Sequence, residues 1–166
     1  MQDHIEKYCS IGWCIFPVEI FAAKDGKITK KPLITDWINK ATNKHDEAVE
    51  LFKAFPNAGI GVATGKRSGI TVIDIDVKAG KNGFVTLEAL NITIPATATQ
   101  VTPTGGQHKF FKYTPDLKNS VSTIDGVDVR NDGGFIVLAP SVFPDGRSYE
   151  WNIEEEPWNY QKSQKS

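Results

Sequence analysis

The stretch "TVIDIDVK", Thr71 to Lys78, alternates apolar and acidic residues and decides how the fold is interpreted. Ile73 and Ile75 have the spacing of side chains on one face of a β-strand, so Asp74 and Asp76 project from the other, about 6.6 Å apart. Two such carboxylates repel each other, and desolvation adds to the penalty. A divalent cation would cancel both penalties, so the stretch predicts a strand that displays metal ligands. The alternative is a solvated face whose aspartates pair with lysines.

Length and charge bound the class of protein. A chain of 166 residues is enough for one domain with a packed core. The formal net charge of −1 excludes a general attraction to nucleic acid, so such binding would need a local basic patch. Cys9 and Cys14 are the only cysteines and lack the C-x-x-C spacing of a zinc site, which predicts buried, reduced thiols. No segment has the length and apolarity of a membrane span, and the polar N-terminus does not resemble a signal peptide, so we expect a cytoplasmic protein without a membrane partner.

The remaining patterns predict helices early and strands later. A strand is predicted from Trp13 to Phe21 with Pro17 at an edge or bend, and Asn43 is predicted to cap a helix with an apolar stripe. In the second half, "GVDVR" (126–130) and "GFIVLAP" (134–140) are predicted to pair across the turn "NDGG". Together these elements predict an α+β fold with a mostly antiparallel sheet.

Domain organisation is predicted from the loss of periodicity near the C-terminus. Residues 1–151 are expected to form one domain, and residues 152–166 a polar tail or the start of a linker. Such a tail fits either a fragment of a longer protein or a protein that acts alone.

A second acidic strand is predicted from "VDVR", residues 127–130. Its two valines share one face, so Asp128 and Arg130 share the other. A third carboxylate beside Asp74 and Asp76 would complete a two-metal cluster for phosphoryl or nucleotidyl transfer, and Arg130 would suit phosphate binding. The alternative is a surface pair between Asp128 and Arg130.

The stretch "TPTGGQH", residues 102–108, offers a third set of polar groups. Gly105 and Gly106 predict a tight turn that allows close backbone approach, with Thr104 before it and His108 after it. Hydroxyl, backbone N–H and imidazole groups together could hold a phosphate. The alternative is a plain hairpin with a surface histidine.

The order of these stretches resembles one known family. "IDID" (73–76), "TPTGGQH" (102–108) and "VDVRNDGG" (127–134), followed by "VLAPS", are similar to the catalytic motifs of the bifunctional DNA primase/polymerase family in the archaeo-eukaryotic primase superfamily. "FPV", "KKPLI", "IGVATG" and "DGRSYEW" also resemble family positions, so the likeness covers nearly the whole chain. The family occurs in replication proteins of plasmids, phages and mobile elements.

The resemblance implies a primase-type catalytic core: an RRM-like, mostly antiparallel sheet with flanking helices. It implies that Asp74, Asp76 and Asp128 bind two Mg²⁺ or Mn²⁺ ions and are the catalytic residues. Some relatives carry a zinc-binding insertion beside the active site, but residues 77–100 of this chain contain neither Cys nor His, so we expect no structural zinc.

The resemblance also implies contacts to the nucleotide. Thr104 and His108 match the motif that contacts the triphosphate of the incoming nucleotide; the family often has serine at the first of these positions, and threonine keeps the hydroxyl. Arg130 matches a basic position near the third acid, and Lys31 in "KKP" is a candidate for contact with nucleotide or template.

The expected function is therefore template-directed nucleotidyl transfer by a DNA primase/polymerase. Its substrates would be dNTPs or NTPs, with a single-stranded DNA template and a primer, and relatives commonly join this domain to a helicase. Three alternatives stay open: a metal-dependent nuclease or other phosphotransferase, a non-catalytic module that binds single strands, and a sugar-nucleotide transferase, in which D-x-D also occurs.

Overall fold

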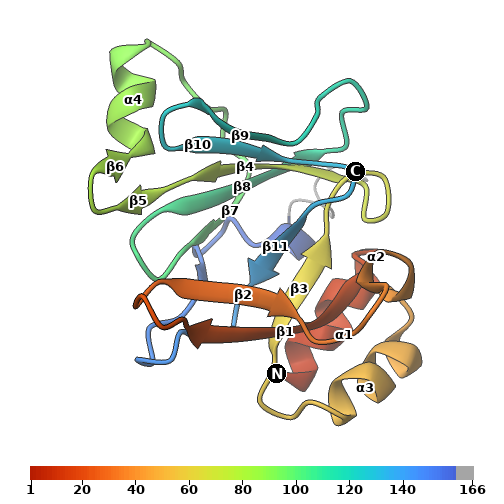
Figure 1. Ribbon diagram of the computed structural model, residues 1–166. Helices are drawn as coiled ribbons and strands as arrows, with labels where there is room; N and C mark the ends of the chain where they lie inside the picture. The colour runs from red at the N-terminus through yellow and green to blue at the C-terminus, as the bar shows by residue number, and fades with distance from the viewer. Residues whose placement is uncertain (160–166) are drawn as a thin grey trace.

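The computed structural model describes residues 1–159, apart from the side chains of Val121 and Ser122, and folds them into two main sheets with helices beside them (Figure 1). The helices are α1 (Gln2–Ser10), α2 (Trp37–Lys40), α3 (His45–Lys53) and α4 (Gly83–Ala89). The first sheet contains β1 (Ile15–Ala22), β2 (Ile28–Pro32), β3 (Gly59–Ala63) and β11 (Phe135–Leu138). The second contains β4 (Ile70–Ile75), β7 (Ala98–Val101), β8 (Gln107–Lys112), β9 (Ser120–Ile124), β10 (Val127–Arg130) and β12 (Glu150–Trp151). A short hairpin joins β5 (Val77–Lys78) to β6 (Lys81–Asn82).

Both sheets are antiparallel throughout. The order of the first is β11-β3-β1-β2, and the order of the second is β12-β7-β8-β4-β10-β9. Figure 1 shows the second sheet above the first, with α1 and α3 beside the first sheet and α4 at the far end of the second. The α+β class predicted from the sequence is confirmed.

The larger core joins α1, α3 and the two sheets. Alternation along β1 sends Ile15 into this core and Phe16 into a smaller core on the opposite face, so both faces of the first sheet are buried. Trp13 lies between the sheets, with its ring stacked on Tyr8 of α1 at 5.6 Å and on Phe110 of β8 at 5.1 Å. Aromatic pairs of this kind contribute about 0.5–1.5 kcal/mol each beyond their buried area. These pairs hold β8 against α1 and the segment that leads into β1.

The strand β4 has a divided inner face. Ile70 and Val72 point into the larger core, whereas Asp74, next on the same face, lies where that core ends. The end of the opposite face of β4 is apolar, because Ile75 packs with Leu87 of α4 and Val127 of β10. The strand is thus anchored on both sides, and its acidic end is held in a fixed position.

The predicted hairpin across "NDGG" is wrong. The strand β10 pairs with β4 and β9 in the second sheet, whereas β11 pairs with β3 in the first, so residues 131–134 cross from one sheet to the other. Asn131 fixes this crossing: its buried side chain accepts a hydrogen bond from Thr71 Oγ1, and its backbone carbonyl accepts one from Thr64 Oγ1. The turn residues were recognised correctly, but the burial of an asparagine between two sheets was not.

Two local expectations also differ from the structure. Pro17 lies inside β1, an interior strand, where its missing N–H costs little because pairing with β2 ends one residue away, at Val18 opposite Pro32. The helix α3 begins at His45 without a side-chain cap, and the side chain of Asn43 donates instead to the carbonyl of Gly12.

Residues 152–159, in the segment predicted as a tail, contact the second sheet. The backbone N–H of Asn152 donates to the carbonyl of Thr99 at 3.0 Å, and the N–H of Thr99 donates to the carbonyl of Glu155 at the same distance. Trp158 packs against the larger core. Residues 160–166 lie outside the described residues.

Candidate functional site

Four polar side chains form one row across four neighbouring strands of the second sheet. Gln100 of β7 is opposite His108 of β8, His108 is opposite Asp74 of β4, and Asp74 is opposite Asp128 of β10. Directly opposite residues in a sheet project from the same face, so the pairing register alone brings these side chains together. Exposure is 0 % for Gln100, 5 % for His108, 8 % for Asp74 and 6 % for Asp128, which places the row at the buried edge of the site.

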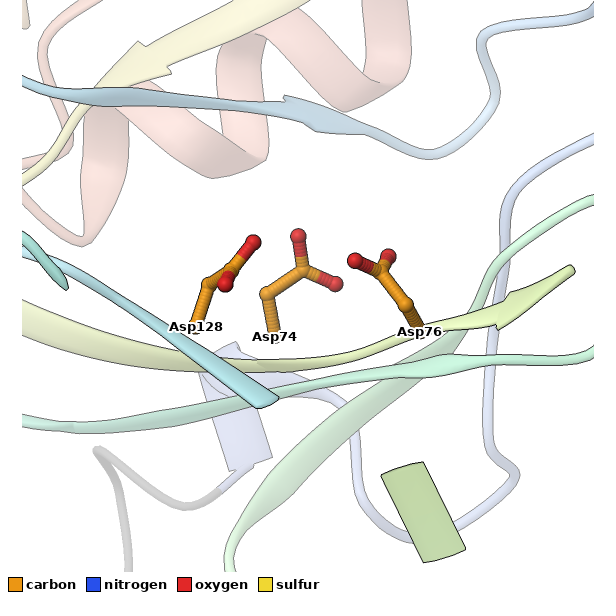
Figure 2. A group of neighbouring side chains, drawn as sticks. All are labelled: Asp74, Asp76 and Asp128. Carbon is orange, nitrogen blue, oxygen red and sulfur yellow. The ribbon is translucent and has the colours of Figure 1, made fainter. Parts of the chain in front are cut away.

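The structure gathers the three predicted carboxylates into one cluster. Asp74, Asp76 and Asp128 each place a carboxylate oxygen within 4.8 Å of the others. Figure 2 shows all three carboxylates on the same side of β4 and β10. Asp76 follows the end of β4, where its N–H donates to the carbonyl of Gly126 and its carbonyl accepts from Gly83, both at 2.8 Å. These two bonds keep Asp76 beside Asp74 although the strand has ended.

The cluster is electrostatically strained in the way expected of close carboxylates. Burial raises the pKa of Asp76, and the charges of Asp74 and Asp128 raise it further. Burial acts in the same direction on Asp74, but its contact with His108 and the charges of Arg130 and Lys30 outweigh burial, so the pKa of Asp74 is lowered. The two central carboxylates therefore differ: Asp74 stays ionised more readily than Asp76.

The donor set suits a hard divalent cation. Three carboxylates supply only oxygen ligands, which Mg²⁺ and Mn²⁺ prefer. The buried Oδ1 atom of Asp74 lies 3.3 Å from His108 Nε2 and has no other hydrogen-bond partner in the described part of the chain. A buried carboxylate oxygen with so few partners is costly unless a cation compensates it. The arrangement is compatible with a metal site formed by Asp74, Asp76 and Asp128.

The turn after β7 places Thr104 near the cluster. Gly105 adopts φ +91°, and a Cβ atom on Gly106 would lie 2.3 Å from the carbonyl oxygen of Ile75 at the end of β4. The first glycine thus allows the turn and the second allows its close approach to β4. Thr102 closes the turn, because its Oγ1 accepts a hydrogen bond from the N–H of Gly106 at 3.0 Å. Thr104 is exposed, and its Oγ1 lies 3.3 Å from that of Thr102.

His108 is held from three sides. Its Nδ1 lies 2.8 Å from the side-chain amide nitrogen of Gln100, and its Nε2 lies 3.3 Å from Asp74 Oδ1. The ring of Tyr149 stacks on the imidazole with 5.9 Å between centroids and 28° between planes. The imidazole is therefore fixed beside the acidic cluster instead of lying on the surface.

Two cavities meet at Asp74 and His108. The Arg130 cavity, of about 640 Å³, extends towards Trp37 and Phe135, and the Thr104 cavity, of about 590 Å³, extends towards the turn 102–106. Both are lined by Lys27, Ile28, Lys30, Asp74, His108 and Tyr149. The Thr104 cavity also has Lys78 and Arg147 in its wall, so it combines cationic and hydroxyl groups beside the carboxylates.

The basic residues predicted from the sequence lie in different places. Arg130 lines the Arg130 cavity, and its Nη2 lies 3.6 Å from Asp128 Oδ2. Both lysines of β2 are exposed, but Lys30 lines both cavities whereas Lys31 lines neither. Desolvation in the cleft lowers the pKa of Lys30, while the charges of Asp74 and Asp76 act in the opposite direction.

Several residues of the cleft were missed by sequence reasoning. Tyr149 and Arg147 belong to "DGRSYEW", which was noted only as a family-like stretch, and Gln100 was not singled out at all. Lys30 could have been chosen over Lys31 only by knowing which face of β2 is turned to the carboxylates. Burial raises the pKa of Tyr149, and the charges of Asp74 and Asp76 raise it further.

Within the part of the chain that the structure describes, no helix is long and apolar enough to cross a bilayer.

Comparison with known proteins agrees with this geometry. A search among curated proteins finds no match to the chain. The family model for the N-terminal domain of bifunctional DNA primase/polymerases matches residues 5–160. The match spans both sheets, all three aspartates and the turn at Thr104, and it fits the primase-type core expected from the sequence. The chain belongs to the bifunctional DNA primase/polymerase family, as an N-terminal domain of that type.

Proposed function

We propose that this protein is a template-directed nucleotidyltransferase, which extends or starts a DNA strand with Asp74, Asp76 and Asp128 as its catalytic metal ligands. The observation that supports this most is the acidic cluster of Figure 2, in which the carboxylates of Asp74 in β4, Asp76 just after it and Asp128 in the paired strand β10 lie within 4.8 Å of one another. When bound there, two Mg²⁺ or Mn²⁺ ions would favour deprotonation of a 3′-hydroxyl and offset the charge of the triphosphate.

The residues of the Thr104 cavity would bind the triphosphate. Thr104 would supply a hydroxyl, and His108 would supply an imidazole beside Asp74. Gly105 and Gly106 would act as nucleotide-binding residues by shaping the turn that presents Thr104, since their N–H groups donate to Thr102. Lys30 adds positive charge close to the same carboxylates. Charged donors of this kind form the stronger class of hydrogen bonds to phosphate.

Arg130 and Lys31 would act further from the triphosphate. Arg130 lies on the other side of the cluster and would contact a phosphate in the Arg130 cavity, which leaves room for the nucleotide at the primer end. Lys31 stays a candidate for contact with the template, since alternation along β2 turns it away from the face of Lys30. The wider context, a replication protein of a plasmid, phage or mobile element with a helicase partner, is proposed from the resemblance alone.

The test is extension of a labelled primer on a single-stranded template with dNTPs or NTPs and Mg²⁺ or Mn²⁺. We expect extension by the wild type and only background extension by Asp74→Asn, because that variant keeps the side-chain shape but removes a ligand charge. Asp125→Asn, which removes an exposed carboxylate from the turn before β10, is the matched control and should extend normally. Equal extension by wild type and Asp74→Asn would refute the assignment.

A nuclease or another phosphotransferase is the second candidate, because the same three carboxylates would serve it. The cationic wall formed by Lys30, Lys78 and Arg147 beside Thr104 favours a substrate with several phosphates, such as a nucleotide. Degradation of DNA without added nucleotides would decide for the nuclease.

A further inference from the structure

Gln100 is a completely buried polar side chain at one end of the row that contains the acidic cluster. Its Nε2 donates to the carbonyl of Val137 at 2.8 Å, and its Oε1 accepts from the N–H of Ala139 at 3.0 Å. A backbone N–H can only donate and a carbonyl can only accept, so these two bonds leave one orientation for the amide. They also join β7 of the second sheet to the end of β11 in the first.

The fixed amide dictates the role of the neighbouring imidazole nitrogen. One hydrogen on Gln100 Nε2 goes to Val137, and the other points at His108 Nδ1, 2.8 Å away. Since Nδ1 must then accept, it carries no proton, and the neutral imidazole has its proton on Nε2. That nitrogen lies 3.3 Å from Asp74 Oδ1, and His108 lines both cavities.

We propose that Gln100 is a positioning residue that holds the proton of His108 on Nε2, so that the imidazole presents one hydrogen-bond donor to the acidic cluster or to a phosphate bound there. The phosphate part of this inference rests on the proposed function. Tyr149 fixes the plane of the ring by stacking, but stacking does not select the protonated nitrogen. The selection comes from Gln100, whose own orientation is set by the backbone of β11 and the residue after it.

The first test needs no variant and no substrate. The chain has three histidines, so ¹⁵N-edited NMR of the metal-free protein can assign which ring nitrogen of His108 carries the proton. We expect a protonated Nε2 and an unprotonated Nδ1. A proton on Nδ1 would overturn the inference whether or not the protein is a polymerase.

The second test moves the proton. Gln100→Glu places an acceptor where the amide donates and should shift the proton of His108 to Nδ1, while Gln100→Met removes the hydrogen bond with little change of shape. Gln107→Glu makes the same chemical change on the opposite face of β8 and should leave the tautomer unchanged. A folded Gln100→Glu protein with the proton still on Nε2 would overturn the proposal.

Kinetics then separate positioning from a purely structural role. In primer extension, Gln100→Glu should raise KM for the nucleotide about tenfold or more, with a smaller change in kcat. The reason is that the variant moves the proton of His108 away from Nε2, so the imidazole loses its contact with the phosphate of the bound nucleotide. An unchanged KM in a variant whose tautomer has moved would refute the phosphate contact. If the wild type showed no nucleotide activity at all, the proposed function would fail, but the NMR result would still decide the role of Gln100.

Discussion

Asp76→Asn should stabilise the metal-free protein although it removes a proposed catalytic residue. Asp76 lies beside two other carboxylates, and its pKa is raised by burial and by their charges. A carboxyl group whose pKa is higher in the folded than in the unfolded state is harder to ionise in the folded state. Its ionisation therefore costs folding free energy, and the cost is absent below the unfolded-state pKa of about 3.9 and grows as the pH rises above it.

The magnitude follows from the spacing of the cluster. Two unit charges 4.8 Å apart repel by about 0.9 kcal/mol in bulk water and by about 3.5 kcal/mol at an effective dielectric constant of about 20. Asp76 is only half-buried, and the charge of Asp74 is partly offset by Arg130 and Lys30, so the lower part of this range applies. We expect Asp76→Asn to gain about 1 kcal/mol at neutral pH, which corresponds to a rise in Tm of about 2–4 °C for a chain of this length.

The assay is thermal unfolding in a chelator, at about pH 7.5 and again at about pH 3.5, with Asp125→Asn as the control for the loss of one exposed charge. The gain should largely disappear at the lower pH, because Asp76 is then mostly protonated in both states. Adding Mg²⁺ or Mn²⁺ should reverse the order: at about ten times its Kd the ion stabilises the wild type by about 1.4 kcal/mol, and it stabilises the variant less.

Three outcomes would refute this reasoning. Asp76→Asn could unfold at a lower Tm than the wild type in chelator, its Tm difference could be the same at both pH values, or metal could stabilise both proteins equally. The first two would show that the carboxylates do not repel at the spacing observed, and the third would show that Asp76 is not a metal ligand.

Three further predictions concern the parts of the chain that hold the site. Gly106→Ala should destabilise the fold by more than about 2 kcal/mol in urea unfolding, since its Cβ would meet a backbone carbonyl of β4 at 2.3 Å. Gly105→Ala should cost less, about 1–2 kcal/mol, which is the cost of placing a side chain on a residue with left-handed backbone angles. Asn131→Ala should cost about 2–4 kcal/mol in the same assay, because it leaves buried partners of the crossing segment unsatisfied. Cys9, whose pKa burial raises to about 11, and Cys14, whose pKa burial also raises, should react with a thiol reagent at neutral pH only after unfolding, when two equivalents should appear.

The elements of the fold were predictable where one local pattern decided them. Period-two alternation identified β4 and β10, and an apolar stripe identified α3, because each pattern reflects burial of a single face. The pairing of β10 and β11 was not predictable in this way. A glycine-rich turn between two apolar strands has the same local chemistry whether the chain turns back or crosses to another sheet, and the choice depends on where Asn131 is buried.

The acidic members of the site were predictable because a charge on a buried strand has few explanations. Their neighbours were not, since Lys30, Tyr149 and Gln100 are ordinary residues until the sheets are placed against each other. The sequence contains two adjacent lysines in "KKP", and they differ only in the face of β2 from which each side chain projects. Residue type therefore indicated the chemistry, whereas tertiary packing determined which residues surround it.

The divided face of β4 explains how one strand can serve both purposes. Ile70 and Val72 bury the first half of its inner face in the larger core, and Ile75 buries the end of its outer face against α4. Burial of such side chains contributes about 1.5–3 kcal/mol each, which exceeds the repulsion of about 1 kcal/mol expected at Asp76. The core can therefore hold Asp74 and Asp76 together without a metal. The free energy of metal binding is then not needed to fold the strand. A site built in this way would be formed before a metal ion binds, and a cation at the carboxylates would offset the remaining cost of holding Asp74 buried with only His108 beside its Oδ1.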